Sequence, residues 1–261
     1  MDKLFVTYLK EWFYSYVKSY QSDDPERQRN FDLKEDHTRR VCRQIIEIGR
    51  DLGLNEEEQR ISEIIALFHD IGRFEQYDRY NTFNDRFSLN HAEFGVKILR
   101  EKGVLNPIGA SSRELILKAI SNHNLATLPR HEDETCLFFS RLLRDADKLD
   151  IWRVVTEYYQ RKANGEQNHA IELDLPDSPG ISSGVYRDLM SQKIVDICSM
   201  ENLNDFKLLQ VGWVYDVNFI PTFRRLSQKG YLNVIRNVLP DSDAIREIFA
   251  TVGSYLDEKL Q

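Results

Sequence analysis

The chain has 261 residues, enough to bury a substantial hydrophobic core in one large domain or two small ones. Its 35 basic and 42 acidic residues give a net charge of −7, which argues against broad binding to nucleic acid polymers or anionic membranes, although a local basic site could still bind a phosphate. The three cysteines are an odd number without a CxxC pair. We therefore expect them to be small buried hydrophobic residues in a reducing compartment.

The N-terminal stretch, residues 1–20, is rich in aromatic residues but is interrupted by Lys10 and Glu11. It lacks the apolar run of a signal peptide and the roughly 20 apolar residues of a membrane span. We predict an amphipathic helix that packs on the domain, and a membrane-surface anchor is the less favoured alternative. Because no other segment approaches a membrane span, the sequence predicts a cytoplasmic protein that does not act at a membrane.

Apolar residues recur at helical spacing through most of the remaining chain. Asn90 and Gly103 are suited to begin and end one of the predicted helices. Residues 164–184 are rich in Gly, Pro, Ser and Asp and predict a long surface loop, in which residues 170–175 could form a short hairpin arm. The helical stripes before this loop fall at residues 37–52, 60–72, 90–103, 111–124 and 135–162.

Helical patterns resume over residues 186–261, with a turn at residues 239–243. Strand alternation and internal repeats are absent from the sequence, so the predicted fold class is all-α. The loop at residues 164–184 could separate a second domain, but we favour packing of the C-terminal helices back onto the first part of the chain, so that residues 1–261 form a single domain.

Four of the six histidines and two aspartates lie on, or at the margin of, the apolar faces of five predicted helices. A single histidine in such a place is usually a core residue with one satisfied hydrogen bond. Burying six such polar or ionisable groups without partners would destabilise the fold, and a bound metal ion would offset this loss for all of them at once. Imidazole and carboxylate suit first-row divalent ions, whereas the lack of cysteine argues against a structural zinc site. The six candidate ligands are His37, His69, Asp70, His91, His123 and Asp147.

Six nitrogen and oxygen ligands exceed what one tetrahedral ion uses, and they suit two ions bridged by a carboxylate. Asp70 is the natural bridge, because each of its two oxygens can face one ion. The remaining histidines, His131 and His169, follow no helical stripe and are expected at the surface.

The order of these residues resembles the HD-domain superfamily of metal-dependent phosphohydrolases. The family pattern is a His, a His-Asp doublet and a distant Asp, matched here by His37, by His69 with Asp70, and by Asp147. The stretches LFHDIGR and RDADKLD resemble the doublet region and the helix of the last Asp. The resemblance covers residues of roughly 30–155. It implies an all-α HD-domain helical bundle, with the extra C-terminal helices packed on the core.

Within that resemblance, Asp147 is the last ligand because it directly precedes Lys148. Asp145 or Asp150 would replace it only in a different register. His91 and His123 lie where the binuclear subset of the superfamily carries two further histidines.

One branch of the superfamily, which cleaves cyclic dinucleotides, carries a Gly-Tyr-Pro signature and another His pair beside the fourth His. Here Asn124 follows His123, and Gly-Tyr-Pro does not occur. His131 could be a relic of that pair, but it follows Pro129 in a polar segment, which favours a surface position.

The resemblance implies hydrolysis of a phosphate ester, namely a phosphomonoester, a nucleotide or a phosphodiester. Two divalent ions (Fe, Mn, Co, Ni or Mg) would activate a water that Asp70 orients, while Lys148 and Arg73 would hold phosphate oxygens. We expect a small phosphate ester or nucleotide as the partner. The sequence leaves open whether the chain also forms a homo-oligomer. Four aromatic residues would line a substrate pocket or pack in the core: Phe74, Tyr77, Tyr80 and Phe83.

Two alternatives remain at the level of sequence. HD-domain oxygenases such as myo-inositol oxygenase hold two irons with the same six ligands and activate dioxygen. We favour hydrolysis because it is the more widespread activity of the superfamily. The other alternative is a degenerate metal site that senses a ligand or serves as a scaffold, and the complete ligand set argues against it.

Overall fold

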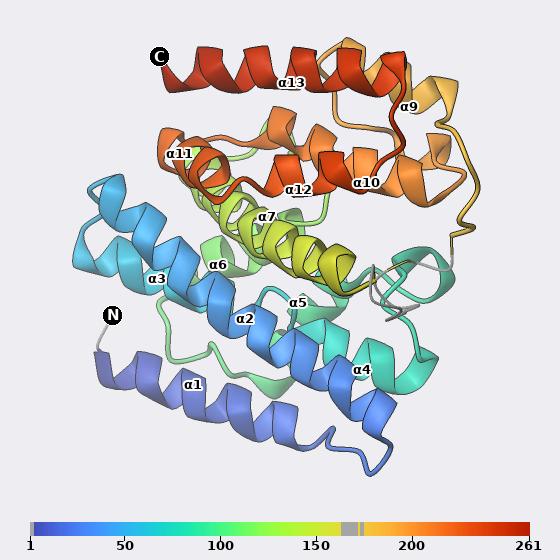
Figure 1. Cartoon of the computed structure of the whole chain (residues 1–261). Coiled ribbons are helices and arrows are strands. Elements are labelled where there is room, and N and C mark those ends of the chain that lie inside the picture. Colours follow the sequence, from blue (N-terminus) through green and yellow to red (C-terminus); the bar gives the residue numbers. More distant parts are fainter. Residues whose placement is uncertain (1–2, 163–171, 173–174) are drawn as a thin grey trace. The chain divides into compact units, whose positions relative to one another are not determined.

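The computed structural model describes residues 3–162, 172 and 175–261. These residues form α-helices joined by turns and short 3-10 segments, and no strand occurs among them (Figure 1). The predicted all-α fold is therefore confirmed. The chain divides into two compact units, of which the first ends at Asp150 and the second begins at Ile151. That residues 1–261 form one domain stays a prediction.

The first unit consists of six complete helices and the start of a seventh among its described residues. The bounds are α1 Lys3–Lys18, α2 Pro25–Asp51, α3 Glu56–Phe68, α4 Ile71–Tyr80, α5 His91–Lys102, α6 Ala110–Asn122 and α7 Glu134–Lys162, with a 3-10 segment, η1, at Asp85–Phe87. The helix α7 continues into the second unit.

Local capping residues set where the site-bearing helices begin. The Asp24 carboxylate accepts from the backbone N–H groups of Glu26 and Arg27 at the start of α2. Asn90 caps α5, and Gly103 ends it with a φ of 62°, as the sequence predicts. These caps fix the register of the two helices that carry His37 and His91.

The N-terminal helix α1 is amphipathic and packs within the first unit, as predicted. Its buried stripe is Val6, Leu9, Phe13 and Val17. The Phe13 ring packs edge-on against Phe68, with ring centroids 6.4 Å apart. Among the described helices, none is both long enough and apolar enough to cross a membrane.

Two glycines bring α4 and α5 into close contact. A Cβ atom at Gly72 would lie 2.3 Å from the backbone oxygen of His91 and 2.8 Å from the backbone nitrogen of Gly95. Only glycine fits at such a distance, so this crossing places the start of α5 directly beside the start of α4.

The prediction of one continuous helix over residues 60–72 is wrong, because the helix is interrupted at His69 and Asp70. Helix α3 ends at Phe68, and α4 begins at Ile71. Asp70 has φ −104° and ψ 16°, outside the helical region. In a continuous helix the side chains of His69 and Asp70 would diverge by about 100°. The break frees the Asp70 side chain from that constraint.

The second unit continues α7 and adds five helices among its described residues. Their bounds are α9 Ser183–Met190, α10 Leu203–Gly212, α11 Ile220–Lys229, α12 Tyr231–Asn237 and α13 Asp243–Leu260, with 3-10 segments η2 Ile197–Ser199 and η3 Trp213–Asp216. The Trp152 indole N–H donates to the backbone oxygen of Gln210 at 2.8 Å, which joins α7 to α10. The predicted turn at residues 239–243 separates α12 from α13.

The predicted loop at residues 164–184 is only partly covered by the described residues. Residues 175–182 are not helical, whereas Ser183 already belongs to α9. His169 lies outside the described residues, as does the hairpin arm expected at residues 170–175, apart from positions 172 and 175.

Each of the three cysteines is a thiol and not part of a disulfide, as expected, but the expectation of burial is wrong for one of them. Cys136 is buried and Cys42 is partly buried, whereas Cys198 is exposed. Cys198 lies in η2, a short turn whose residues are not buried, and no helical stripe draws its side chain inward.

Candidate metal centre

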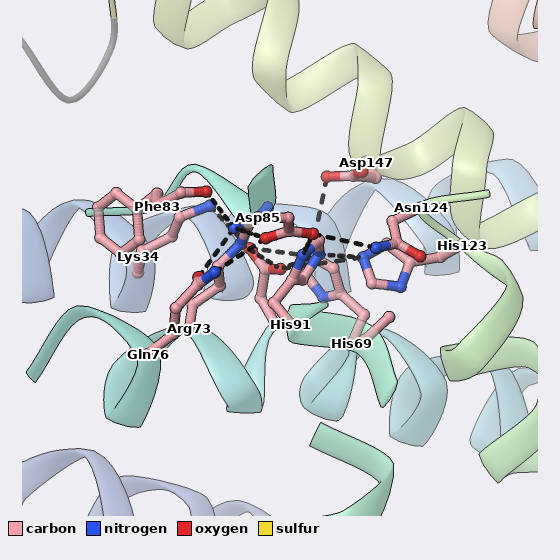
Figure 2. A network of polar contacts seen from close by, with 12 residues as sticks. Lys34, His69, Arg73, Gln76, Phe83, Asp85, His91, His123, Asn124 and Asp147 are labelled. Carbon is pink, nitrogen blue, oxygen red and sulfur yellow. Dashed lines mark hydrogen bonds and ion pairs between the residues drawn. The ribbon is translucent and has the colours of Figure 1, made fainter. Parts of the chain in front are cut away.

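The six predicted ligands come together in the first unit. They lie on α2, α5 and α7, in the α3–α4 turn and at the end of α6. His69 follows the last residue of α3, and Asp70 precedes the first residue of α4. His91 is the first residue of α5. Figure 2 shows His69, His91, His123 and Asp147 around one centre. Two groups have ligand atoms within 4.8 Å of one another: His37, His69 and Asp70, and Asp70, His91 and His123.

The first half-site contains His37, His69 and two carboxylates. The Nε2 atoms of His37 and His69 lie 3.2 Å apart. Asp147 Oδ1 lies 3.0 Å from the former and 3.7 Å from the latter. Asp70 Oδ2 lies 3.7 Å from both. Four donor atoms from three segments therefore surround one point.

The second half-site contains His91, His123 and the other oxygen of Asp70. The Nε2 atoms of His91 and His123 lie 3.0 Å apart. Asp70 Oδ1 lies 3.3 Å from His91 Nε2 and 3.9 Å from His123 Nε2. The two oxygens of Asp70 thus face different histidine pairs.

All four imidazoles carry a proton on Nδ1, because each Nδ1 faces an oxygen that can only accept. In His37 and His91 these oxygens belong to carboxylates, Asp150 Oδ2 at 2.7 Å and Asp85 Oδ2 at 2.6 Å. The other two histidines donate to the backbone oxygen three residues earlier, at 2.8 Å for His69 and 2.7 Å for His123. Each Nε2 is therefore left to act as a ligand atom.

This donor set fits a divalent cation. The Nε2 lone pairs of the neutral His91 and His123 face each other at 3.0 Å and repel each other unless a positive charge lies between them. Nitrogen and oxygen donors without sulfur suit first-row divalent ions.

Each half-site has one histidine oriented by a carboxylate that is itself paired with arginine. Arg40 binds Asp150 through Nε at 2.6 Å and Nη2 at 3.0 Å. Arg73 Nη1 binds Asp85 Oδ1 at 2.8 Å. Figure 2 shows the second pair together with Gln76 and Asn124, whose amides also donate to Asp85, at 2.9 and 3.2 Å.

The pKa shifts favour the ligand forms of most of these groups. Burial lowers the pKa of His69, His91 and His123, to about 3 for His123, where the neighbouring histidines lower it further. Burial would raise the pKa of Asp70, but the positive charges of Lys34 and Arg73 hold it well below its usual range. The carboxylate is thus ionised and these imidazoles are neutral at pH 7, as metal binding requires.

His37 differs from the other three histidines. Burial lowers its pKa, but the hydrogen bonds to Asp147 and Asp150 outweigh burial and raise the pKa to about 9. A metal ion would therefore displace a proton from this imidazole.

Asp147 rather than Asp150 faces the centre. Asp150 lies behind His37, on its Nδ1 side, whereas Asp147 lies on the Nε2 side. Asp145 is fully buried. The side chain of Asp147 keeps 16 % exposure, while those of the four histidines keep 0–5 %.

The predicted phosphate-binding residues lie close to the ligands. Lys148 is 8 % exposed and follows Asp147 on α7. Arg73 Nε lies 3.5 Å from Asp70 Oδ1, but its Nη1 donates to Gln76, Asp85 and the backbone oxygen of Phe83. Arg73 is therefore placed to orient Asp85, and the phosphate role of both residues stays a prediction.

The aromatic residues after the doublet serve mainly in packing. Phe74 is fully buried and Tyr77 nearly so, whereas Tyr80 is 45 % exposed. Phe83 stacks on Tyr77, with centroids 4.7 Å apart. His131 is exposed, as predicted.

Several residues that contact the ligands or the partners of the ligands were not predicted from the sequence. Lys34 lies one helical turn before His37, a spacing that a search for neighbours on one face would find. Asp85 lies in a polar segment without helical periodicity, so no sequence pattern predicts its contact with His91. The missed residues are Lys34, Arg40, Gln76, Asp85 and Asn124, together with Asp150 in its orienting role.

A family model described as the HD domain matches residues 35–152. This range begins two residues before His37, ends five after Asp147 and contains all six candidate ligands. Residues 35–152 are an HD domain. The predicted resemblance is thereby confirmed, over nearly the range expected. No curated protein and no solved structure matches the chain.

HD domains bind divalent metals, and the His/Asp groups of this HD domain fit such ions in residue type, tautomer and burial.

Proposed function

We propose that this HD domain is a phosphohydrolase that binds two divalent ions and cleaves a phosphate ester with an activated water. One observation carries the proposal: the oxygens of Asp70 divide between two histidine pairs, 3.3 Å from His91 Nε2 and 3.7 Å from His37 Nε2. A carboxylate in this position suits two ions that act on one substrate.

Each ion would have its own ligands besides the shared Asp70. The first would be held by His37, His69 and Asp147, and the second by His91 and His123. Bound there, divalent ions would supply a water acidic enough to attack near neutral pH and would neutralise the oxygens of a phosphate ester.

The residues of the chain supply orientation and charge. Asp70 stays ionised and would orient the attacking water. Lys148 and Arg73 are proposed to offset the negative charge of the ester. The exposed fractions suggest the direction of approach, because the side chains of Asp147, Lys34 and Asp85 keep 16, 18 and 29 % exposure at an otherwise buried centre.

A small, anionic ester suits this site better than a polymer. The ligand atoms are recessed behind partly exposed side chains, and the chain carries a net charge of −7, which repels a long polyanion. We therefore propose a phosphomonoester, a nucleotide or a small phosphodiester as the substrate.

The test is phosphate release by the metal-loaded protein. The protein is stripped with a chelator, reloaded separately with Mn, Co, Ni, Mg or Fe, and assayed against phosphomonoesters, nucleotides and phosphodiesters. We expect turnover that depends on the metal and is lost in Asp70→Asn. Asp78→Asn, which removes the charge of a carboxylate on the exposed side of α4, serves as the matched control.

The di-iron oxygenase alternative is tested on the same preparation. Iron-loaded, reduced protein is supplied with a polyol or a phosphonate while dissolved oxygen is recorded. Oxygen consumption without phosphate release from any ester would contradict the hydrolase proposal and support the oxygenase.

A further inference from the structure

Lys34 extends from α2 directly to the carboxylate that the two half-sites share. Its Nζ lies 2.8 Å from Asp70 Oδ2, the oxygen that faces His37 and His69. The same ammonium lies 5.2 Å from the centroid of the Phe83 ring. Figure 2 shows Lys34 and Phe83 side by side at the edge of the network.

The ammonium has donor capacity left for another anion. Lysine carries three N–H donors. Within the described part of the chain, Asp70 is the one hydrogen-bond acceptor on Nζ, and the Phe83 ring face stabilises the charge without accepting a conventional hydrogen bond. Two N–H groups can therefore bind oxygens of a ligand while the third stays on Asp70.

Arg73 offers a contrast at the other oxygen of Asp70. Its Nη1 donates to Gln76, Asp85 and the Phe83 backbone, so these contacts fix the orientation of the guanidinium toward Asp85. Lys34 has no comparable set of protein acceptors among the described residues, and its side chain is 18 % exposed. Arg73 thus has one nitrogen fully used by protein acceptors, whereas the Lys34 ammonium has two N–H groups left for a ligand.

The placement of Lys34 is set by helix geometry. Lys34 and His37 are three residues apart on α2 and so lie on one helix face. One rigid helix thus delivers a metal-ligand candidate and an ammonium to the same half-site.

We infer that Lys34 is a substrate-binding residue whose ammonium donates to the non-bridging oxygens of the phosphate group. The inference rests on the proposed phosphohydrolase function. Phosphate oxygens that approach Asp70 would be repelled by its carboxylate. An ammonium held at that carboxylate offsets the repulsion and adds charge-assisted hydrogen bonds.

The inference is tested by the binding of inorganic phosphate to the metal-loaded protein, which does not depend on turnover. Three variants are compared with wild type by calorimetric titration: Lys34→Met, Lys34→Arg and, as the control, Lys97→Met. Lys97 is an exposed lysine on α5 whose Nζ lies 3.8 Å from Glu101 Oε1 one helical turn away, so the control removes the same charge away from the site.

We expect Lys34→Met to keep its metal ions and its melting temperature, and to bind phosphate about ten- to a hundredfold more weakly, the scale of one charge-assisted contact. Its KM for the best ester should rise. Lys34→Arg should recover part of the phosphate affinity, because the charge and the donors are retained. Lys97→Met should match wild type.

Two results would overturn the inference. If Lys34→Met changes metal affinity but binds phosphate like wild type once metal is saturating, Lys34 only neutralises Asp70. If wild type hydrolyses esters while Lys34→Met has unchanged phosphate affinity and KM, the role of Lys34 is wrong and the proposed function stands. A metal-loaded wild type that neither binds nor releases phosphate would overturn both.

Discussion

Asp85 Oδ2 lies 2.6 Å from His91 Nδ1, although the two residues are separated by a turn and belong to different elements. The His91 hydrogen bond holds the pKa of Asp85 below its usual range, although burial would raise it. Asp85 thereby fixes the tautomer of His91 and strengthens its Nε2 as a donor.

We predict that Asp85→Asn weakens binding at the second half-site while the first still binds metal. Loss of such an outer partner typically lowers metal affinity about ten- to a hundredfold. Asp150→Asn should do the same at the first half-site, because Asp150 holds His37 in the same way. Titration of the stripped proteins with a divalent metal checks this. Binding curves that coincide with wild type for both variants would contradict the role given to these carboxylates.

A second prediction concerns the bridge. Asp70→Ala should bind neither ion at stoichiometric level, because both half-sites lose an oxygen ligand at once. His91→Ala should mainly empty the second position and leave about one ion per chain. Elemental analysis of the two variants, purified in parallel, measures this difference. Undiminished metal in Asp70→Ala would show that its two oxygens do not bridge.

The third prediction tests the α4–α5 crossing. Gly72→Ala would place a methyl group 2.3 Å from the backbone oxygen of His91, and backbone atoms cannot give way without moving the helix. We expect a loss of roughly 1–3 kcal/mol or more in the free energy of unfolding, together with weaker metal binding. Gly253→Ala is the control, since its added Cβ meets nothing within 4 Å. Chemical denaturation of both variants checks the prediction, and equal stability would contradict it.

These cases show which parts of the site are encoded locally. The ends of α5 could be predicted because Asn90 and Gly103 act on their own helix. The inward positions of His37 and His91 follow from the spacing of neighbouring apolar residues. The break at the doublet could not be predicted, because Ile65, Phe68 and Ile71 continue a helical stripe across it.

The partners of the ligands were harder to predict than the ligands. Asp85 reaches His91 through the conformation of a 3-10 turn, which depends on Asn84 and on tertiary contacts with Arg73. Asp150 was noted only as an alternative ligand, because its position behind His37 depends on how α2 and α7 pack. Sequence periodicity predicts on which face of its own helix a residue lies. It does not predict which residues of other elements that face contacts.

The last prediction separates two neighbours on α7. Asp147 Oδ1 lies 3.0 Å from His37 Nε2, so Asp147→Ala should lose metal from the first half-site and activity with it. Lys148 is proposed to bind phosphate without being a ligand, so Lys148→Ala should keep the metals. One charge-assisted contact in a site of low exposure contributes about 1.5–3 kcal/mol, or on the order of ten- to a hundredfold in kcat/KM.

Metal occupancy and rate, measured on the same preparations, distinguish these outcomes. Lys148→Met accompanies Lys148→Ala, because Lys148 is only 8 % exposed and its truncation to alanine leaves a cavity. If both Lys148 variants match wild type on the best ester, Lys148 does not bind the substrate. If they lose metal to the same extent as Asp147→Ala, Lys148 supports the ligand helix, and the phosphate contact must come from another cation, for which Lys34 at Asp70 is the first candidate.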